Sequence, residues 1–575
     1  MRVFRAERSS IAVLLIALAA AVEAGAALAQ SRAPIPLSPP NAAAPPDAAP
    51  AGPRILTAPP ASSDEIQTET LAPVDASWAG TLGAADRGFP RDMWGATPRS
   101  FVATALPLLQ PTTSPALESL KRRLLLSDAN APRGEEPPGG PSLLDRRIER
   151  VLASGYSDGA ALIAALQQNN VSERFDRDSV ELRVVAGNLG AACAAVNERA
   201  PAYGTRWWSE AVIGCQALTG AYDQARLGLS ALREQNADRD HVFETLINAI
   251  LGRRGKLDKF PDPTPFRMAL LAAAKLPLPA DALASAGPGA LAVLATSDNA
   301  PIAARLAAGE RAEALGALPP AALGLLYGAV ESKPEELGAM LKNGKLPDDP
   351  RSRAVLYNLA RTNDPGARRV EALGRLIADA RSRDAFVPMA RLIAPLVAEL
   401  QPSRDLQDFA GDAARVLLAA GAYDRAPPWL ALAERPELWV IANFAQSDRT
   451  KSVSLGDATA ALAHDPEAAP RQADLLVTLA AALGIPLNGV DLGALLSATH
   501  SGTVPNGALW LDQQQAAQAA RLGETVLTSI LLASAGDRLS SEPLVLAQAI
   551  KGLQAVGLEA DARALAVEAA LDAGI

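Results

Sequence analysis

A serine between glycines is the first residue in this 575-residue chain that could do chemistry. The run Gly155-Tyr156-Ser157-Asp158-Gly159 matches the Gly-x-Ser-x-Gly pattern of a hydrolase nucleophile. That chemistry needs a strand before the serine and a parallel sheet around it. The residues that precede it, LLDRRIERVLAS, instead have the apolar spacing of a helix. We therefore interpret the run as a turn between two helices.

Glutamate followed by serine could supply a single catalytic acid, and it occurs at Glu118-Ser119 and Glu331-Ser332. Lytic transglycosylases of the bacterial envelope combine a long helical solenoid with one catalytic glutamate, often in such a pair. The Gly-Leu-Met-Gln element that accompanies the glutamate in that family is missing here. The chain therefore resembles at most the helical scaffold of those enzymes, and we expect neither glutamate to be catalytic.

The residues that most often bind metals are few. The histidines His241, His464 and His500 lie far apart, and no two have the spacing of metal ligands. The two cysteines, Cys193 and Cys215, do not form a zinc motif. Neither a phosphate-binding loop nor a dinucleotide fingerprint is present. We expect no metal, no cofactor and no catalytic residue.

Tryptophan side chains could line a groove for sugars by stacking. The alternative is packing between helices, because tryptophan is mostly buried in folded proteins. We favour core packing for Trp207, Trp208, Trp429, Trp439 and Trp510.

Cys193 and Cys215 carry the sharpest prediction. The residues from Ala200 to Gly204 predict a turn between a helix that ends near Arg199 and one that begins near Arg206. Each cysteine lies eleven residues from Gly204, so the two are level across an antiparallel helix pair. Facing Cα atoms would be roughly 4–6 Å apart, within the ~4.4–6.8 Å that a disulfide tolerates. We predict a disulfide that stabilises by roughly 3 kcal/mol. The alternative is two buried free thiols.

The composition predicts that helices position all of these residues. Apolar residues make up 49 %, charged residues 20 % and aromatic residues 4 %. Alanine and leucine dominate, and such residues lose little rotamer freedom in a helix. Strand-like alternation and β-branched runs are scarce. We predict an all-α fold, an α-solenoid of stacked antiparallel helix pairs.

Local patterns predict where helices begin and which faces they bury. Thr97-Pro98, Ser114-Pro115 and Thr264-Pro265 are typical of an N-cap followed by proline at the first helical position. Apolar residues recur at three- and four-residue spacing in two stripes: Leu218, Tyr222, Ala225, Leu229 and Leu232, and Phe386, Met389, Ile393, Leu396 and Leu400.

One pattern recurs along the chain: a glycine, four residues, then an alanine. We interpret it as the end of one helix, a tight turn, and a new helix whose alanine allows close contact. The first three copies are 32 and 33 residues apart. This resembles the tetratricopeptide (TPR) class of helix-pair repeats, which implies a solenoid with a concave surface. The copies are Gly155–Ala160, Gly187–Ala192, Gly220–Ala225, Gly309–Ala314, Gly421–Ala426 and Gly557–Ala562.

A second resemblance rests on the segments ACAAV, WWSEAVIGCQALTG, LGLSALRE and RLGETVL. They are similar to uncharacterised exported helical proteins of α-proteobacteria. The likeness is one of composition, and it implies export and a helical fold.

The first 29 residues have the three parts of a secretory signal peptide. Arginines at the start precede an apolar run of twelve residues from Ile11 to Val22, which is shorter than the ~20 residues that cross a bilayer. Ala27-Leu28-Ala29 predicts cleavage between Ala29 and Gln30. We expect a periplasmic or secreted protein with no membrane insertion after cleavage.

The rest of the chain divides by composition into three parts. Residues 30–63 are rich in proline and alanine and predict a disordered linker. Residues 64–140 predict a partly irregular segment with the first helices, and residues 141–575 predict the helical repeat domain. Large apolar groups in residues 64–95 favour packing against the following helices; the alternative is a docking peptide for another protein.

Charge and architecture leave two classes of function. The net charge is −9 without a basic tract, so nucleic acid is not an expected partner. We expect a non-enzymatic periplasmic scaffold that binds one or more envelope proteins. The alternative is an envelope enzyme, or an enzyme subunit, that acts on peptidoglycan or polysaccharide. A deep pocket with two convergent acidic or polar side chains would favour the enzyme.

Protein purified from the periplasm should begin at Gln30, because signal peptidase cleaves after the small-residue site. Intact mass and N-terminal sequencing measure this directly. Recovery of a chain that retains Met1 in the membrane fraction would contradict a cleaved signal.

Overall fold

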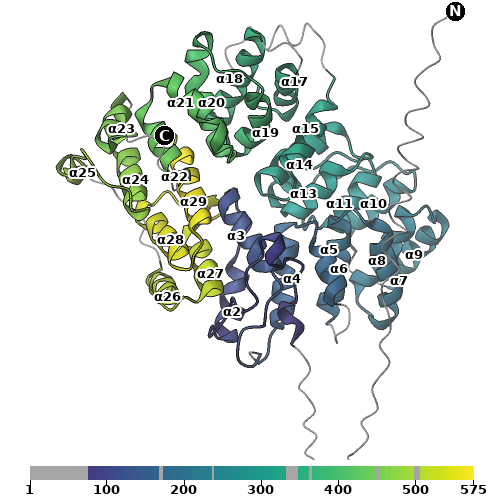
Figure 1. Cartoon of the computed structure of the whole chain (residues 1–575). Coiled ribbons are helices and arrows are strands. Elements are labelled where there is room, and N and C mark those ends of the chain that lie inside the picture. Colours follow the sequence, from purple (N-terminus) through teal and green to yellow (C-terminus); the bar gives the residue numbers. More distant parts are fainter. Residues whose placement is uncertain are drawn as a thin grey trace, which may run out of the picture. The chain divides into compact units, whose positions relative to one another are not determined.

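The chain has an all-α fold (Figure 1). The computed structural model describes residues 75–575, except for residues 137, 167–171, 236–238, 332–346, 362–365, 447–452, 465–466 and 498–505. The predicted signal peptide with Ala29 and Gln30, the linker at 30–63, residues 64–74, Ser332 and His500 lie outside the described residues. Residues from Pro73 onward belong to one compact unit. In its described parts, strands are limited to the two-residue hairpin of β1 (Ser534–Ala535) and β2 (Arg538–Leu539).

The helices of the first half run to residue 328. They are α2 (Arg99–Ala105), α3 (Pro115–Leu126), α4 (Leu143–Ser154), α5 (Gly159–Leu166), α6 (Glu173–Val185), α7 (Leu189–Arg199), α8 (Arg206–Leu218), α9 (Tyr222–Gln235), α10 (His241–Ile250), α11 (Pro265–Ala273), α12 (Ala280–Ser285), α13 (Pro288–Thr296), α14 (Ile302–Ala314) and α15 (Pro320–Gly328). Short 3₁₀ turns precede or join them: η1 (Ala76–Trp78), η2 (Ala84–Asp86), η3 (Leu106–Leu108) and η4 (Ala200–Ala202).

The second half continues in the same style. Its helices are α17 (Pro350–Arg361), α18 (Ala367–Ser382), α19 (Phe386–Ala398), α20 (Gln407–Ala419), α21 (Pro427–Ala433), α22 (Pro436–Ala445), α23 (Leu455–Ala461), α24 (Ala469–Ala482), α25 (Leu492–Ser497), α26 (Gly507–Gln518), α27 (Leu522–Ala533), α28 (Pro543–Ala555) and α29 (Glu559–Asp572). The 3₁₀ turns here are η5 (Arg404–Leu406), η6 (Tyr423–Arg425) and η7 (Leu462–His464).

Two of the three predicted helix starts are confirmed. Ser114 accepts a hydrogen bond from Leu117 N at the start of α3, and Thr264 accepts one from Arg267 N at the start of α11. The prediction for Thr97 was wrong by one residue. Pro98 occupies the N-cap of α2 with extended backbone, because it forms a bridge with Arg133.

Most of the recurring glycines end a helix, as predicted. Five of the six adopt positive φ values between helices, where an L-residue would be strained; Gly220, for example, has φ 83°. Gly309 is the exception, since it lies inside α14. A Cβ there would lie 2.9 Å from the side chain of Leu326, so close helix packing explains this glycine.

The two predicted apolar stripes have different outcomes. The stripe from Phe386 to Leu400 is buried along α19 and just beyond it, as predicted. The stripe from Leu218 to Leu232 is interrupted at Gly220, so Leu218 and Tyr222 belong to different helices. Tyr222 is 48 % exposed, and only Ala225, Leu229 and Leu232 of this stripe are buried.

Helices make contacts both along the chain and between its distant parts (Figure 1). Neighbours in sequence pack together, as in α6 with α7, α8 with α9 and α19 with α20. In addition, α3 contacts both α27 and α29. Arg123 on α3 forms an ion pair of 2.8 Å with Asp561 on α29, and Gly523 N donates to Met93 O over 2.8 Å. The stacking of antiparallel pairs into a solenoid stays a prediction.

The described part of the segment 64–95, residues 75–95, packs against helices of the same chain. Trp78 and Trp94 are both buried, with ring centroids 4.7 Å apart in an edge-to-face contact. Arg147 on α4 is fully buried and donates to the carbonyl oxygens of Ala79 and Leu125. Backbone without regular structure is thus held by a helix side chain, and residues 75–95 are engaged within the chain.

The cysteines lie where the turn prediction places them. Helix α7 ends at Arg199 and α8 begins at Arg206. Cys193 and Cys215 are both buried, with Cα atoms 5.5 Å apart and sulfur atoms at disulfide distance.

Digestion with trypsin after alkylation, without reduction, should leave the peptides 184–199 and 207–226 joined, because only a disulfide links them. Mass spectrometry of periplasmic protein measures this, and a reduced sample, in which the peptides separate, is the control. If both peptides carry a single alkyl group without reduction, the thiols are free in the protein.

Candidate functional site

A cleft of about 300 Å³ opens between α6, α11 and α13. Its charged lining comes from Arg177, Asp178 and Glu181 on α6 and from Asp262 before α11. Backbone and small side chains form the rest, among them Thr264, Ser285, Gly287 and Gly289. Acidic side chains therefore outnumber basic ones in a concave site.

Helix α6 contributes two acidic residues to the cleft, and one of them, Glu181, reaches the start of α11. Asp178 and Glu181 are three residues apart, so they share one helix face. Glu181 is 3 % exposed, and its Oε2 accepts a hydrogen bond of 2.7 Å from Phe266 N in the first turn of α11. The free N–H groups and the dipole at a helix start favour a negative charge there.

One oxygen of each carboxyl group is left without a protein donor. Glu181 Oε1 and Asp178 Oδ2 are both buried and have no hydrogen-bond partner. A buried carboxylate oxygen normally accepts a hydrogen bond, because desolvation without a partner costs free energy. Both residues line the same cleft.

Burial shifts both acids toward neutrality. Desolvation raises the pKa of Glu181 to about 7, although the hydrogen bond from Phe266 N and the nearby Thr264 side chain oppose the shift. Desolvation likewise raises the pKa of Asp178 to about 6, against the attraction of Arg174 and Arg177. The pair therefore exchanges protons near neutral pH.

Aromatic side chains stand beside the cleft. The guanidinium of Arg177 lies over the Trp207 ring, 5.3 Å from its centroid. Trp208 is buried, stacks on Tyr203 at 5.1 Å and donates to Glu173 on α6. The aromatic rings thus fill the space between α6 and α8. Trp208 and Trp429 are buried as predicted, whereas Trp207, Trp439 and Trp510 are half-buried.

The predicted nucleophile motif is a turn. Gly155 ends α4 with φ 71°, and Ser157 is exposed before α5 begins. A helix, and not a strand, therefore precedes the serine, as the sequence predicted. His241 is exposed at the start of α10, and His464 lies in η7, so these two histidines are not brought together.

Glu118 is buried in an ion pair, which the sequence did not indicate. Its Oε1 accepts from Thr112 N at 2.9 Å and from the Lys121 ammonium, and its Oε2 accepts from the Tyr156 hydroxyl at 2.9 Å. Burial raises the pKa of Glu118 even beside Lys121. Tyr156 belongs to the predicted turn motif, so that motif supports α3. Glu331, by contrast, is exposed after α15.

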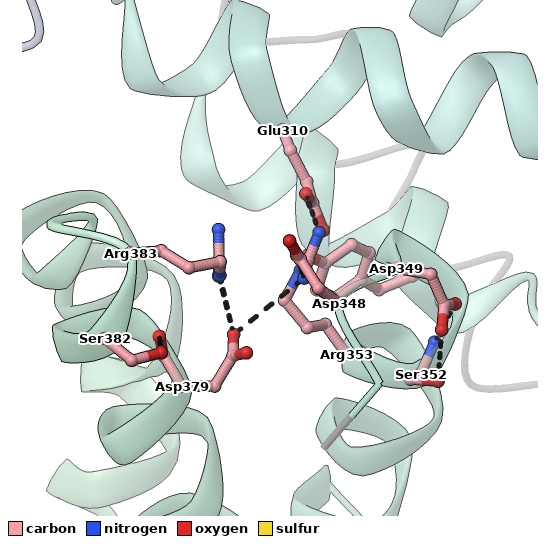
Figure 2. Close-up of polar contacts among 9 residues, drawn as sticks. Glu310, Asp348, Asp349, Ser352, Arg353, Asp379, Ser382 and Arg383 are labelled. Atoms are coloured by element: carbon pink, nitrogen blue, oxygen red, sulfur yellow. Dashed lines mark hydrogen bonds and ion pairs between the residues drawn. The ribbon is translucent and has the colours of Figure 1, made fainter. Parts of the chain in front are cut away.

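A second network joins α14, α17 and α18 (Figure 2). Arg353 is 4 % exposed and forms two hydrogen bonds with Glu310, of 2.8 and 2.7 Å. It also pairs with Asp348 at 3.1 Å and lies 3.9 Å from Asp379, which in turn pairs with Arg383 at 2.7 Å. Each charge here has a counter-charge, so the network holds helices together.

The described residues contain no group of three histidine, cysteine or acidic side chains placed to hold a metal ion. Within the same residues, no helix is both long and apolar enough to cross a membrane. No protein-family model, curated protein or solved structure matches the chain.

Replacing Arg353 with methionine should destabilise the fold by ~3–5 kcal/mol, because Glu310 would keep a largely buried charge without its partner, whereas Asp379 would still pair with Arg383. Chemical denaturation followed by circular dichroism measures the change. Arg353→Met combined with Glu310→Gln should lose less stability, since the unpaired charge of Glu310 is removed.

The matched control is Arg226→Met, which breaks an ion pair with the fully exposed Asp223 and should leave stability unchanged. Equal losses for Arg226→Met and Arg353→Met would show that the network in Figure 2 has no special role.

Proposed function

We propose that the chain is an exported, non-enzymatic helical scaffold that binds a protein partner in the bacterial cell envelope. The N-terminal signal pattern supports export to the periplasm or beyond. Long helical arrays serve in many proteins as binding surfaces. A fold by itself does not determine a function, so the proposal rests on one observation in the structure.

That observation is the complete engagement of Glu118. A catalytic glutamate must offer one oxygen or one proton to its substrate. Both oxygens of Glu118 instead accept hydrogen bonds, from Thr112 N and Lys121 on one side and from Tyr156 on the other. One of the two glutamates in Glu-Ser pairs is thereby engaged in contacts that hold α3.

A second candidate function is an envelope enzyme acting on peptidoglycan or polysaccharide. The cleft beside α6 favours it, because Asp178 and Glu181 both line this cleft. A division of roles between acid and base needs environments that separate the two pKa values. Here burial raises the pKa of Asp178 to about 6 and that of Glu181 to about 7. The two pKa values are therefore too similar for separate roles as acid and base. The scaffold therefore remains the better supported proposal.

Binding should depend on exposed leucines, which are the large apolar groups a protein partner would cover. Leu227 on α9, Leu325 on α15 and Leu544 on α28 are each more than 70 % exposed. We expect one of the three leucine-to-aspartate variants to lose a partner captured by the mature chain. Affinity capture from periplasm with quantitative mass spectrometry measures this.

The same preparations test the enzyme. Release of soluble fragments from peptidoglycan should be undetectable for the native chain and for Glu118→Gln. Release that Asp178→Asn or Glu181→Gln abolishes, with the helical spectrum unchanged, would replace the scaffold by the second candidate. Retention of the same proteins by all three leucine variants would also contradict binding through these faces.

A further inference from the structure

We infer that the cleft between α6, α11 and α13 binds a primary ammonium group, with Glu181 and Asp178 as its acceptors. The inference goes beyond the proposed function, since a scaffold needs no such site.

Two acceptors without donors define the site. Glu181 Oε1 and Asp178 Oδ2 are buried, unpaired and part of the lining of one cleft. Glu181 is 3 % exposed, so water reaches it poorly, and a buried acceptor without a donor costs free energy, more so when it is charged. A ligand that supplies N–H donors to both oxygens recovers this cost.

The single unpaired oxygen of Glu181 favours an ammonium over a guanidinium as the ligand. A guanidinium binds best when both oxygens of one carboxylate are free to receive its two parallel N–H groups. One oxygen of Glu181 is already bonded to Phe266 N, so only a single acceptor remains. An ammonium is a compact charge with three rotatable donors, and it can bond to one oxygen on each of two carboxylates.

The same donor set argues against a divalent metal. Calcium takes roughly six to eight oxygen ligands and magnesium about six in strict geometry. No group of three acidic, histidine or cysteine side chains suited to a metal is found among the described residues. Two oxygens suffice for an ammonium, which keeps its third N–H for the Thr264 hydroxyl or water.

The charges around the cleft also favour a cation. Three carboxylates and one guanidinium line it, those of Asp178, Glu181, Asp262 and Arg177. The Arg177 guanidinium lies over the Trp207 ring on the side of α8. Farther charges act on Asp178: Arg174 lowers its pKa, and Glu149 and Asp145 raise it. The acidic excess lies at the lining itself.

Binding must strengthen as pH rises, because only ionised carboxylates accept all the ammonium donors. The pKa of Glu181 is about 7 and that of Asp178 about 6, whereas an alkylammonium keeps its proton well above neutrality. Between about pH 6 and about pH 8 the ionised fraction of Glu181 rises roughly tenfold, and the affinity should rise by a similar factor.

Calorimetric titration of the full mature chain with n-butylamine tests the site. We expect millimolar binding at about pH 8 that weakens about tenfold at about pH 6, and at least about tenfold weaker binding by Glu181→Gln and by Asp178→Asn. Tetramethylammonium has the same charge without N–H donors and should bind far more weakly. Nα-acetyl-lysine amide in place of butylamine distinguishes a lysine side chain from a free amine as the source.

Glu313→Gln is the matched control, because Glu313 is also buried with its pKa raised to about 7, but it lies on α14 away from the cleft. In Glu181→Gln the amide oxygen can still accept from Phe266 N, so α11 should keep its start. Butylamine that binds equally to Glu181→Gln and the native chain, or does not bind the native chain, would overturn the inference. So would equal binding of tetramethylammonium.

Discussion

The first N–H groups of a helix have no partner within that helix, and this fold satisfies several of them with buried glutamates from distant parts of the chain. Glu181 on α6 accepts from Phe266 N in α11, and Glu568 on α29 accepts from Ala116 N in α3. The second bond spans 452 residues of sequence. Helix starts that proline and a capping hydroxyl begin locally are thus completed by acids from far away, and the packing of whole helices depends on them.

Burial raises the pKa of these glutamates alike, but it leaves their carboxyl oxygens with different hydrogen-bond partners. Desolvation raises the pKa of Glu181, Glu568 and Glu313 to about 7 in each case. What differs is the second oxygen. Both oxygens of Glu118 have donors. One oxygen of Glu181 has none, and it lines a cleft. The difference between Glu118 and the proposed binding group Glu181 is therefore a single missing donor.

The sequence could predict what is decided locally. The turn before Arg206 predicted the register of α7 and α8. Ser114 and Thr264 predicted the starts of α3 and α11, because capping involves residues three apart in sequence. The prediction that Gly309 ends a helix was wrong. The sequence alone does not distinguish a glycine that permits close packing inside a helix from one that ends it. Asp178 and Glu181 could not be singled out, because charged residues on a helix are usually solvated. Glu181 is paired with the start of α11, 85 residues later in the sequence.

The same limit explains why the repeat signal is clear in single turns but fades as a period. Gly220 and Gly557 both end a helix in the left-handed region, and each is followed five residues later by a buried alanine. The helices they introduce have different surroundings. α9 packs mainly on its neighbour α8, whereas α29 contacts α28, α22, α20 and α3. A helix buried on many sides needs apolar residues all round, while one with a single neighbour needs a stripe. Accordingly, the buried residues of α9 are Ala225, Leu229 and Leu232, whereas α29 is buried continuously from Leu565 to Leu571. A turn pattern can recur under both conditions, but a full repeat sequence cannot.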